Sequence, residues 1–132
     1  MDVHLTDLQL AIVRVLWERG ECTVAVTQAS LLPERPLAQT TVATILTRLE
    51  KRGVVAHRPN GRQFVYRALV TEGDVRLSMV RSLTDMLFGG SSAALINHVL
   101  LDRGVTEQEF GELRRIVAAA GEQELGERAN AA

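Results

Sequence analysis

The chain has 132 residues, a formal net charge of −1 and a hydrophobic content of 46%. This length suits one ordinary domain or two small ones, and the apolar content excludes a wholly disordered protein. No apolar run approaches the roughly 20 residues needed to cross a bilayer, and the amino terminus lacks the basic start of a signal peptide. The single cysteine, Cys22, excludes an internal disulfide and fits a reducing compartment. We therefore expect a cytoplasmic protein without membrane insertion.

Charge is divided unevenly along the chain. Residues 1–70 hold nine Lys and Arg against six Asp and Glu, a net charge of +3, whereas residues 71–132 hold six against ten, a net charge of −4. A basic half beside an acidic half indicates contact with a polyanion in the first half and a different role for the second.

The chain begins with two predicted helices. Residues 6–9, Thr-Asp-Leu-Gln, have the pattern of a capping box, and the apolar stripe that follows ends before Gly20. A threonine is placed to cap a short second helix over about residues 23–32. We expect Val26 and Ala29 to be its inward-facing side chains.

A third helix, predicted over about residues 38–52, is the element on which the interpretation depends. Its apolar residues recur at the spacing of one buried helix face, namely Val42, Ile45, Leu46 and Leu49. The opposite face carries short hydroxyl side chains followed by two cations: Thr40, Thr41, Thr44, Thr47, Arg48 and Lys51. Hydroxyl side chains let a helix approach a DNA duplex closely, while Arg and Lys contact phosphates and guanine edges. Taken alone, the pattern equally fits a helix with a solvated polar face.

A β-hairpin is predicted over residues 54–69, directly after this helix. Asn60-Gly61, which we expect at the centre of its turn, is the strongest short-range hairpin signal. From residue 35 to residue 67 there are seven cations against one acid, Glu50. A helix followed by a basic hairpin predicts a winged helix-turn-helix, in which the helix enters the major groove and the hairpin lies along the flanking backbone.

This arrangement assigns roles to nine candidate DNA-binding residues. Thr40, Thr41 and Thr44 are placed for base edges at the start of the helix. Arg62 at the wing tip is expected to contact the backbone or the minor groove. The other five residues are expected within reach of phosphates, which fix register and affinity rather than sequence choice: Thr47, Arg48, Lys51, Arg58 and Arg67.

The second half predicts three further helices, over residues 71–88, 91–101 and 106–120, and a flexible polar tail over residues 121–132. Three such helices seldom bury their apolar stripes alone, so we expect a dimerisation region. Its expected contact residues are Val75, Met79, Leu83, Leu87, Leu95, Val99, Phe110, Leu113 and Val117. The alternative is a lobe folded back on the first domain. The fold class is thus mainly α, with a winged-helix domain over residues 1–70 and a helical dimerisation region over residues 71–120.

Catalysis and metal binding find no support in the sequence. His4, His57 and His98 lie in three different predicted elements, without the short regular ligand spacing that zinc sites need. No nucleophile-elbow, P-loop or paired-histidine motif is present. We expect no enzyme activity, no cofactor and no metal site.

In order and spacing, these segments resemble the penicillinase-repressor family, which comprises the BlaI and MecI repressors and copper-responsive CopY relatives. The resemblance extends to about Ala120. The residues that carry it are Leu8-Gln9-Leu10-Ala11-Ile12-Val13, Leu16-Trp17, Thr23-Val24, Thr41-Val42, Thr44, Leu46, Arg48-Leu49, Lys51, Gly53, Phe64, Tyr66, Leu95-Ile96-Asn97, Glu109 and Leu113-Arg114.

The resemblance implies a homodimeric repressor that occupies a palindromic DNA operator until a signal releases it. In the members that respond to β-lactam antibiotics, a membrane sensor with a metalloprotease domain cuts the dimerisation region at an Asn-Phe bond. The matching position here is Asn97-His98, where histidine replaces phenylalanine. The copper-responsive members instead carry a carboxy-terminal cysteine cluster, which this chain lacks. The sequence leaves open the inducing signal, the operator and the regulated genes.

Two other functions remain open from the residues alone. One is a ligand-sensing winged-helix regulator of the MarR type, which would need aromatic side chains around a pocket, and the chain has five aromatic residues. The other is a winged-helix module that contacts protein rather than DNA, against which the basic run over residues 35–67 argues.

Overall fold

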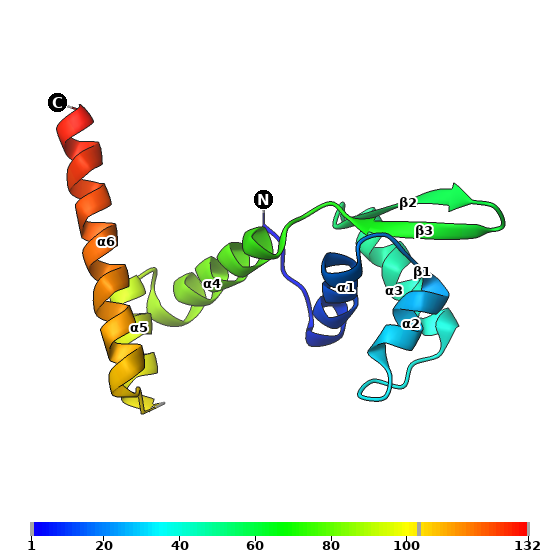
Figure 1. The fold of residues 1–132 in the computed structure, drawn as a ribbon, viewed down its shortest axis with the longest axis horizontal. Helices are drawn as coiled ribbons and strands as arrows, with labels where there is room; N and C mark the ends of the chain where they lie inside the picture. Colours follow the sequence, from blue (N-terminus) through cyan, green and yellow to red (C-terminus); the bar gives the residue numbers. More distant parts are fainter. Residues whose placement is uncertain (1, 103, 132) are drawn as a thin grey trace. The chain divides into compact units, whose positions relative to one another are not determined.

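A computed structural model describes residues 2–102 and 104–131. Within them the chain forms six helices and three short strands (Figure 1). In chain order the elements are α1 (Asp7–Arg19), β1 (Cys22–Thr23), α2 (Val24–Leu31), α3 (Gln39–Lys51), β2 (Val55–Asn60), β3 (Gln63–Ala68), α4 (Glu72–Phe88), α5 (Ser92–Asp102) and α6 (Glu107–Ala131). The chain divides into two compact units, the first ending at Leu87 and the second beginning at Phe88.

The capping box predicted for α1 is confirmed. The Thr6 hydroxyl accepts the backbone N–H of Gln9 at 3.2 Å, and the Gln9 side chain accepts the N–H of Thr6 at 3.0 Å. These two bonds satisfy donors that a helix start leaves without partners. Gly20 then ends the helix with a φ of 81°, a conformation that glycine adopts without strain.

The predicted inner face of α2 is wrong. Thr23 caps this helix as expected, because its hydroxyl accepts the N–H of Val26. Val26 and Ala29, however, are exposed, and Thr27 and Leu31 are the buried residues. Thr27 can be buried because its hydroxyl donates to the Thr23 carbonyl at 2.8 Å. A helix of eight residues is too short for its apolar spacing to identify one face.

The position of α3 is set by its buried face and by its end. Val42, Leu46 and Leu49 have no exposed surface, so they fix the rotation of the helix on the core. At its carboxyl end, the N–H of Val54 bonds to the Leu49 carbonyl, and the N–H of Gly53 bonds to the Glu50 carbonyl. This pair of bonds is a Schellman motif around a left-handed glycine, which turns the chain directly into the hairpin.

The two hairpin strands belong to a three-stranded antiparallel sheet in the order β1-β3-β2, so β3 is the central strand and β2 is an edge strand. Figure 1 shows the β2–β3 ribbon projecting beyond the helices of its unit. The turn lies one residue later than predicted: Asn60 pairs with Gln63, so Gly61 and Arg62 are the two turn residues. Of the two, only Gly61 has a positive φ, 66°. A two-residue turn with glycine first needs one such residue, whereas the expected Asn-Gly turn needs two.

Helix α4 packs on the winged-helix domain at its start. The Ser78 hydroxyl accepts the backbone N–H of Val3 at 2.7 Å, and Val75 is buried in the same core. The indole N–H of Trp17 donates to the Val70 carbonyl at 2.8 Å, which fastens the segment before α4. The first compact unit therefore extends past the boundary expected after residue 70 and includes α4 as far as Leu87.

The second unit consists of α5 and α6, and none of its described side chains is buried. Ser91 caps α5 by accepting the N–H of Ala94, and Thr106 caps α6 by accepting the N–H of Glu109. The polar tail predicted from residue 121 is instead helical, because α6 continues to Ala131. An Arg128–Glu124 pair at i, i+4 supports this last stretch, and Ala132 lies outside the described residues.

Among the described residues, no helix combines the length and apolar character needed to span a membrane.

Candidate nucleic-acid interface

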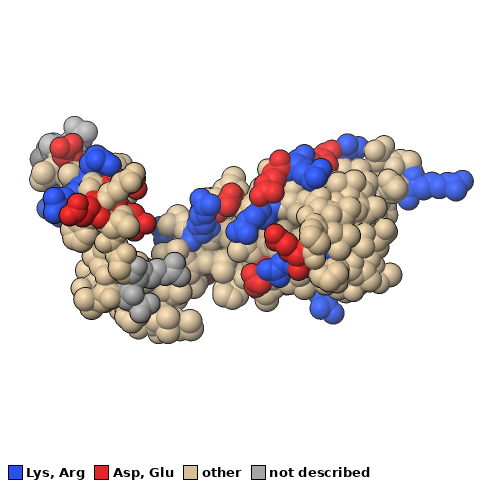
Figure 2. All heavy atoms as spheres, turned by 60° about the horizontal axis from the view of Figure 1, so that its bottom comes forward, with Lys and Arg blue, Asp and Glu red and all other residues tan. Residues whose placement is uncertain are grey.

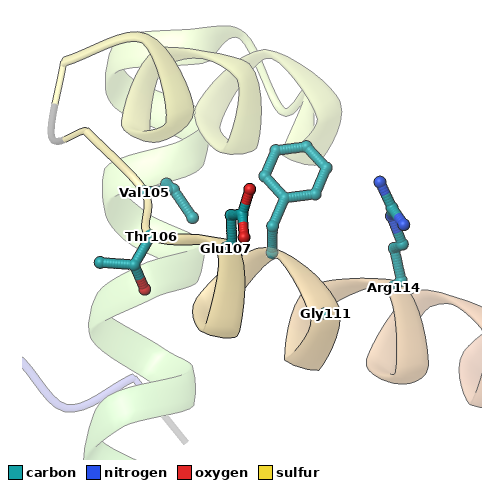
Figure 3. Close-up of a pocket in the computed structure, with 6 residues that line it drawn as sticks. Val105, Thr106, Glu107, Gly111 and Arg114 are labelled. Carbon is teal, nitrogen blue, oxygen red and sulfur yellow. The ribbon is translucent and has the colours of Figure 1, made fainter.

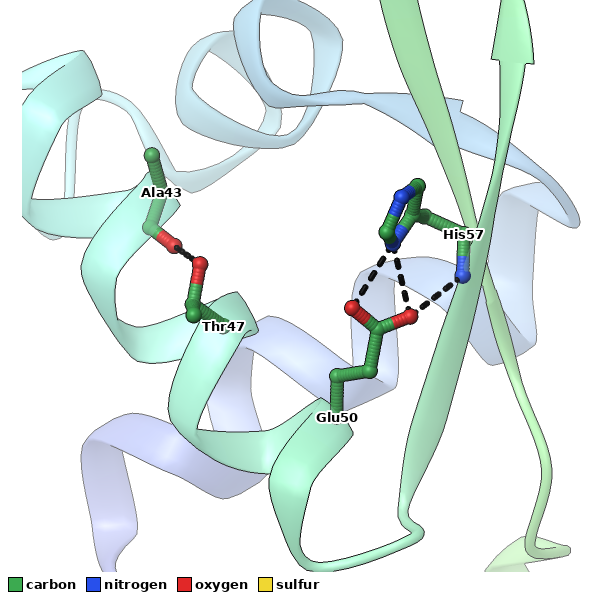
Figure 4. Close-up of polar contacts among 4 residues, drawn as sticks. All are labelled: Ala43, Thr47, Glu50 and His57. Atoms are coloured by element: carbon green, nitrogen blue, oxygen red, sulfur yellow. Dashed lines mark hydrogen bonds and ion pairs between the residues drawn. The ribbon is translucent and has the colours of Figure 1, made fainter.

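The exposed face of α3 is lined by threonines at its start and by cations at its end. All six predicted residues of this face are exposed: Thr40, Thr41, Thr44, Thr47, Arg48 and Lys51. Thr44 donates its hydroxyl hydrogen to the carbonyl of Thr40 at 2.9 Å. Thr47 donates its own to the carbonyl of Ala43, also at 2.9 Å (Figure 4). Each hydroxyl oxygen therefore keeps lone pairs free to accept a bond, and each methyl group can make an apolar contact.

Four cations of α3 and of the hairpin make no ion pair with the described part of the protein. Within the part of the chain that the structure describes, no ion pair involves Arg48, Lys51, Arg62 or Arg67. Arg62 is exposed in the hairpin turn, and Arg67 is exposed on β3. Figure 2 shows a basic side chain projecting at the edge of the first unit, with no acidic side chain beside it. Cations without internal partners can bind an external polyanion without first breaking an ion pair.

Arg58, which the sequence predicted as a phosphate contact, is engaged by the protein itself. Its Nη2 donates to Glu21 at 2.6 Å, and its Nε donates to the same carboxylate at 3.1 Å. This hydrogen-bonded pair lowers the pKa of Glu21 and raises the pKa of Arg58. Glu21 precedes β1, so the pair reaches across the sheet from one edge strand to the other. Glu21 takes up the Nε side of the guanidinium, so Arg58 has Nη1 left for a phosphate, and its charge is partly offset by the carboxylate.

His57 of β2 is hydrogen-bonded to the end of α3. The Glu50 carboxylate lies 2.7 Å from His57 Nδ1 and accepts the backbone N–H of His57 at 2.9 Å (Figure 4). The imidazole ring also packs on Phe64, with 4.3 Å between ring centroids. Glu50 is the sole acid of the basic run, and the charge count alone could not place it at the base of the hairpin.

A small cavity of about 190 Å³ is lined by residues that the sequence analysis did not include among the candidate DNA-binding residues. It lies where the start of α2, the start of α3 and the start of β3 come together. Its lining residues are Thr23, Val24, Ala25, Gln39, Gln63 and Phe64. Phe64 is 53% exposed although it is aromatic, and Gln39 opens the exposed face of α3. Phe64 and Tyr66 lie on the same face of β3, so strand alternation alone does not predict which of the two rings is exposed.

The comparison with known proteins now decides the family. A family model described as Penicillinase repressor matches residues 5–119. The chain belongs to the penicillinase repressor family. This is a family of DNA-binding transcriptional repressors with a winged-helix fold. The match includes the whole first unit from residue 5 onward and extends into the first half of α6.

Individual family members are distant in sequence but similar over most of their length. The penicillinase repressor of Bacillus licheniformis is 24% identical over 114 residues, which are 86% of this chain and 89% of that protein. The methicillin resistance regulatory protein MecI of Mammaliicoccus sciuri is 20% identical over 114 residues, 86% of this chain and 93% of that protein. The solution structure of the DNA-binding domain of the repressor BlaI is 27% identical, with a TM-score of 0.50, and covers 56% of this chain and 90% of that one.

The residues predicted for dimerisation of this repressor fall into two groups. Val75 is 2% exposed and has almost no surface to offer a second copy, whereas Met79 packs on the same core but is only partly buried. The other seven are exposed or half-buried: Leu83, Leu87, Leu95, Val99, Phe110, Leu113 and Val117. Figure 2 shows much of the second unit as uncharged surface.

A surface cavity of about 490 Å³ lies beside Phe110 in the second unit (Figure 3). Its lining comes from the turn before α6 and the first two turns of that helix: Val105, Thr106, Glu107, Phe110, Gly111 and Arg114. Arg114 stands over the Phe110 ring at 5.3 Å. Only one of the six lining residues is aromatic, which differs from the aromatic-lined pocket that a MarR-type sensor would need.

Asn97 and His98 are exposed in the middle of α5, and the His98 ring lies 5.7 Å from that of Phe88. Over the described ranges, no group of three or more His, Cys, Asp or Glu side chains could hold a metal ion.

Proposed function

We propose that this repressor binds a palindromic DNA operator as a homodimer, with α3 as its recognition helix and the β2–β3 hairpin as its wing. One observation carries the proposal: α3 and the wing expose a threonine face together with Arg48, Lys51, Arg62 and Arg67, none of which is ion-paired within the described residues. Membership of a family of DNA-binding repressors supports it.

Thr40, Thr41 and Thr44 are the proposed base-contacting residues. Their methyl groups suit the thymine methyl, and their hydroxyl oxygens accept from adenine or cytosine amino groups. Thr47 and the four cations are the proposed phosphate contacts, which set affinity and register. Arg58 is a weaker phosphate contact in this proposal, because Glu21 already accepts bonds from two of its nitrogens.

The proposed dimer uses the second unit and the exposed residues of α4. A pair of helices with no buried side chain is not stable by itself, since packing supplies most helix stability in proteins. A second copy that covers Val99, Phe110 and Val117 would provide the missing packing. Two recognition helices related by a two-fold axis would then read two half-sites of one palindrome.

An electrophoretic shift with the DNA upstream of the repressor's own gene tests the proposal. The full-length protein should retard this fragment at concentrations that leave an unrelated fragment of equal length free. The triple variant Thr40→Ala, Thr41→Ala, Thr44→Ala should lose this preference but keep non-specific binding, because its cations are intact. Equal retardation of both fragments by the wild-type protein would contradict the operator assignment.

Release by a membrane sensor metalloprotease belongs to the same proposal. The support for it is the family membership and the exposure of Asn97 and His98 on α5. His98 changes the residue after the scissile bond from the Asn-Phe of β-lactam-responsive relatives. Cells exposed to a β-lactam should contain a fragment that ends at Asn97, and intact repressor in cells whose target gene is induced would reject this route.

A further inference from the structure

One carboxylate of α3 holds the base of the wing by three polar contacts to His57. Glu50 lies in the last turn of α3, and both of its oxygens lie 2.7 Å from His57 Nδ1. The carboxylate also accepts the backbone N–H of His57 at 2.9 Å (Figure 4). Because β2 is an edge strand, it has a neighbouring strand on one side only, and the Glu50 carboxylate receives an N–H that β3 does not bond.

The same histidine is held by the wing. In the strand register His57 pairs with Tyr66, so both side chains lie on one face of the hairpin, and Phe64 lies two residues from Tyr66 on that face. The His57 ring is 4.3 Å from the Phe64 ring and 5.5 Å from the Tyr66 ring. Tyr66 is buried, whereas Phe64 is half exposed. The contacts therefore run from the last turn of α3, through His57, to both the core and the exposed part of the wing.

We propose that Glu50 and His57 are positioning residues for DNA binding: by tying β2 to the end of α3, they set the angle between wing and recognition helix and so bring Arg62 to the duplex. The inference rests on the proposed DNA binding and adds a role for two side chains that need not touch DNA. A rigid tie lowers the entropy lost when the wing is ordered on DNA, which increases affinity without a new contact.

An opposite expectation follows if Glu50 acts through its charge alone. An acid among seven cations repels phosphate, so its removal would then tighten binding. Positioning predicts weaker binding on removal. The sign of the change in affinity separates the two roles.

The test is a double-mutant cycle between Glu50 and Arg62, measured by fluorescence anisotropy with the full-length protein. The probes are the duplex from upstream of its own gene and an unrelated duplex of equal length. Glu50→Ala should weaken operator binding by about tenfold, the usual scale for losing a hydrogen-bonded charged partner. Arg62→Ala should then cost much less in the Glu50→Ala background than in the wild type, because the wing is already displaced.

Matched variants keep the outcome unambiguous. Glu18→Ala removes one exposed acid from α1 and should leave affinity unchanged. Glu50→Gln retains an acceptor for the His57 N–H and should recover most of the lost affinity. Should Glu50→Ala fail to fold, His57→Gln carries the same cycle with Arg62→Ala. Tighter binding by Glu50→Ala, or additive losses, overturns the inference alone, whereas a wild-type protein that binds neither duplex overturns the proposed function as well.

Discussion

Arg62 is the proposed phosphate contact at the tip of the hairpin. It occupies the second turn position between β2 and β3, is exposed, and makes no ion pair in the described chain. A tip cation that meets a phosphate contributes to affinity for any sequence and releases a counterion.

Arg62→Ala should therefore weaken binding to operator and to unrelated DNA alike, and reduce the slope of log affinity against log salt by about 0.9. Anisotropy titrations at several salt concentrations measure both quantities. Arg115→Ala, which removes an exposed cation from α6, serves as the control and should leave the slope unchanged. If the slope stays the same in Arg62→Ala, Arg62 is not at the interface.

Glu21 partly neutralises a second cation of the proposed wing. Its carboxylate accepts bonds from two nitrogens of Arg58, which should weaken any contact between that guanidinium and a phosphate. Glu21→Gln should weaken this hold, tighten binding to the unrelated duplex and steepen the salt slope by up to about 0.9. Glu18→Gln, which removes an acid elsewhere on the first unit, is the matched control. Unaltered non-specific binding in Glu21→Gln would mean that Arg58 lies away from the DNA.

The Glu21–Arg58 pair also links stability to pH. The hydrogen bond from Arg58 lowers the pKa of Glu21, and the nearby charges of Arg58 and Arg67 act in the same direction. For a carboxyl whose folded pKa is depressed, stability is present above the unfolded value and is lost as the pH falls through the folded value. The stability difference between wild type and Glu21→Gln should thus be constant from neutral pH down to about 5 and shrink below about 4. Urea unfolding across this range measures it, and a difference that persists in acid would refute the linkage.

At the scale of elements, α3, the proposed recognition helix, lacks a side-chain cap. Ala38 occupies the N-cap position with extended backbone angles of −71° and 150°, which suit a capping serine. Ala38→Ser should let a hydroxyl accept the N–H of Thr41 and should stabilise the domain by about 1 kcal/mol. Thermal unfolding followed by circular dichroism measures this gain. Ala38→Val offers no hydroxyl and should not raise the melting temperature. A serine variant that is no more stable than the wild type would indicate that water already accepts hydrogen bonds from the N–H groups at the start of α3.

Features that depend on neighbouring residues could be predicted from the sequence, while features that depend on packing could not. The Thr6–Gln9 capping box and the buried stripe of α3 follow from spacing, and the structure confirms them. Strand β1 has two residues, too few for any periodicity, so its pairing with β3 was not foreseen. The turn lies one residue later than predicted, because Asn60 pairs with Gln63 as the last residue of β2.

In the candidate interface too, local features could be predicted from the sequence and contacts between distant residues could not. Exposure of the threonine face and of Arg62 followed from amphipathic spacing and turn chemistry. The partners of Arg58 and His57 did not, because Glu21 is 37 residues from Arg58 in sequence and meets it only across the completed sheet. A charge count treats all cations as equal, whereas in the folded protein some of them, such as Arg58, are bonded to acidic side chains.

At the scale of the whole molecule, the two units differ in how well they bury their apolar residues. The first has a continuous core with residues such as Ile12, Val13 and Leu46 fully enclosed. In the second, Val99, Ile116 and Val117 are all at least 46% exposed, and α5 bears no charged side chain from Ser92 to Leu101. Exposed apolar side chains on two adjacent elements support the proposal that a second copy covers this surface.

Phe110→Asp tests whether a second copy of the chain covers this surface. Phe110 is 44% exposed in the isolated chain and lies beside the 490 Å³ cavity at the start of α6. A charge placed in an apolar dimer interface would be desolvated without a partner, so the variant should sediment as a monomer where the wild type sediments as a dimer. Gln108→Asp adds the same charge to an exposed polar position of α6 and should remain dimeric. Because one copy reads one half-site, monomeric Phe110→Asp should bind a half-operator as well as the wild type does, yet lose its preference for the full palindrome. An intact dimer in this variant would place the dimer interface elsewhere than at Phe110.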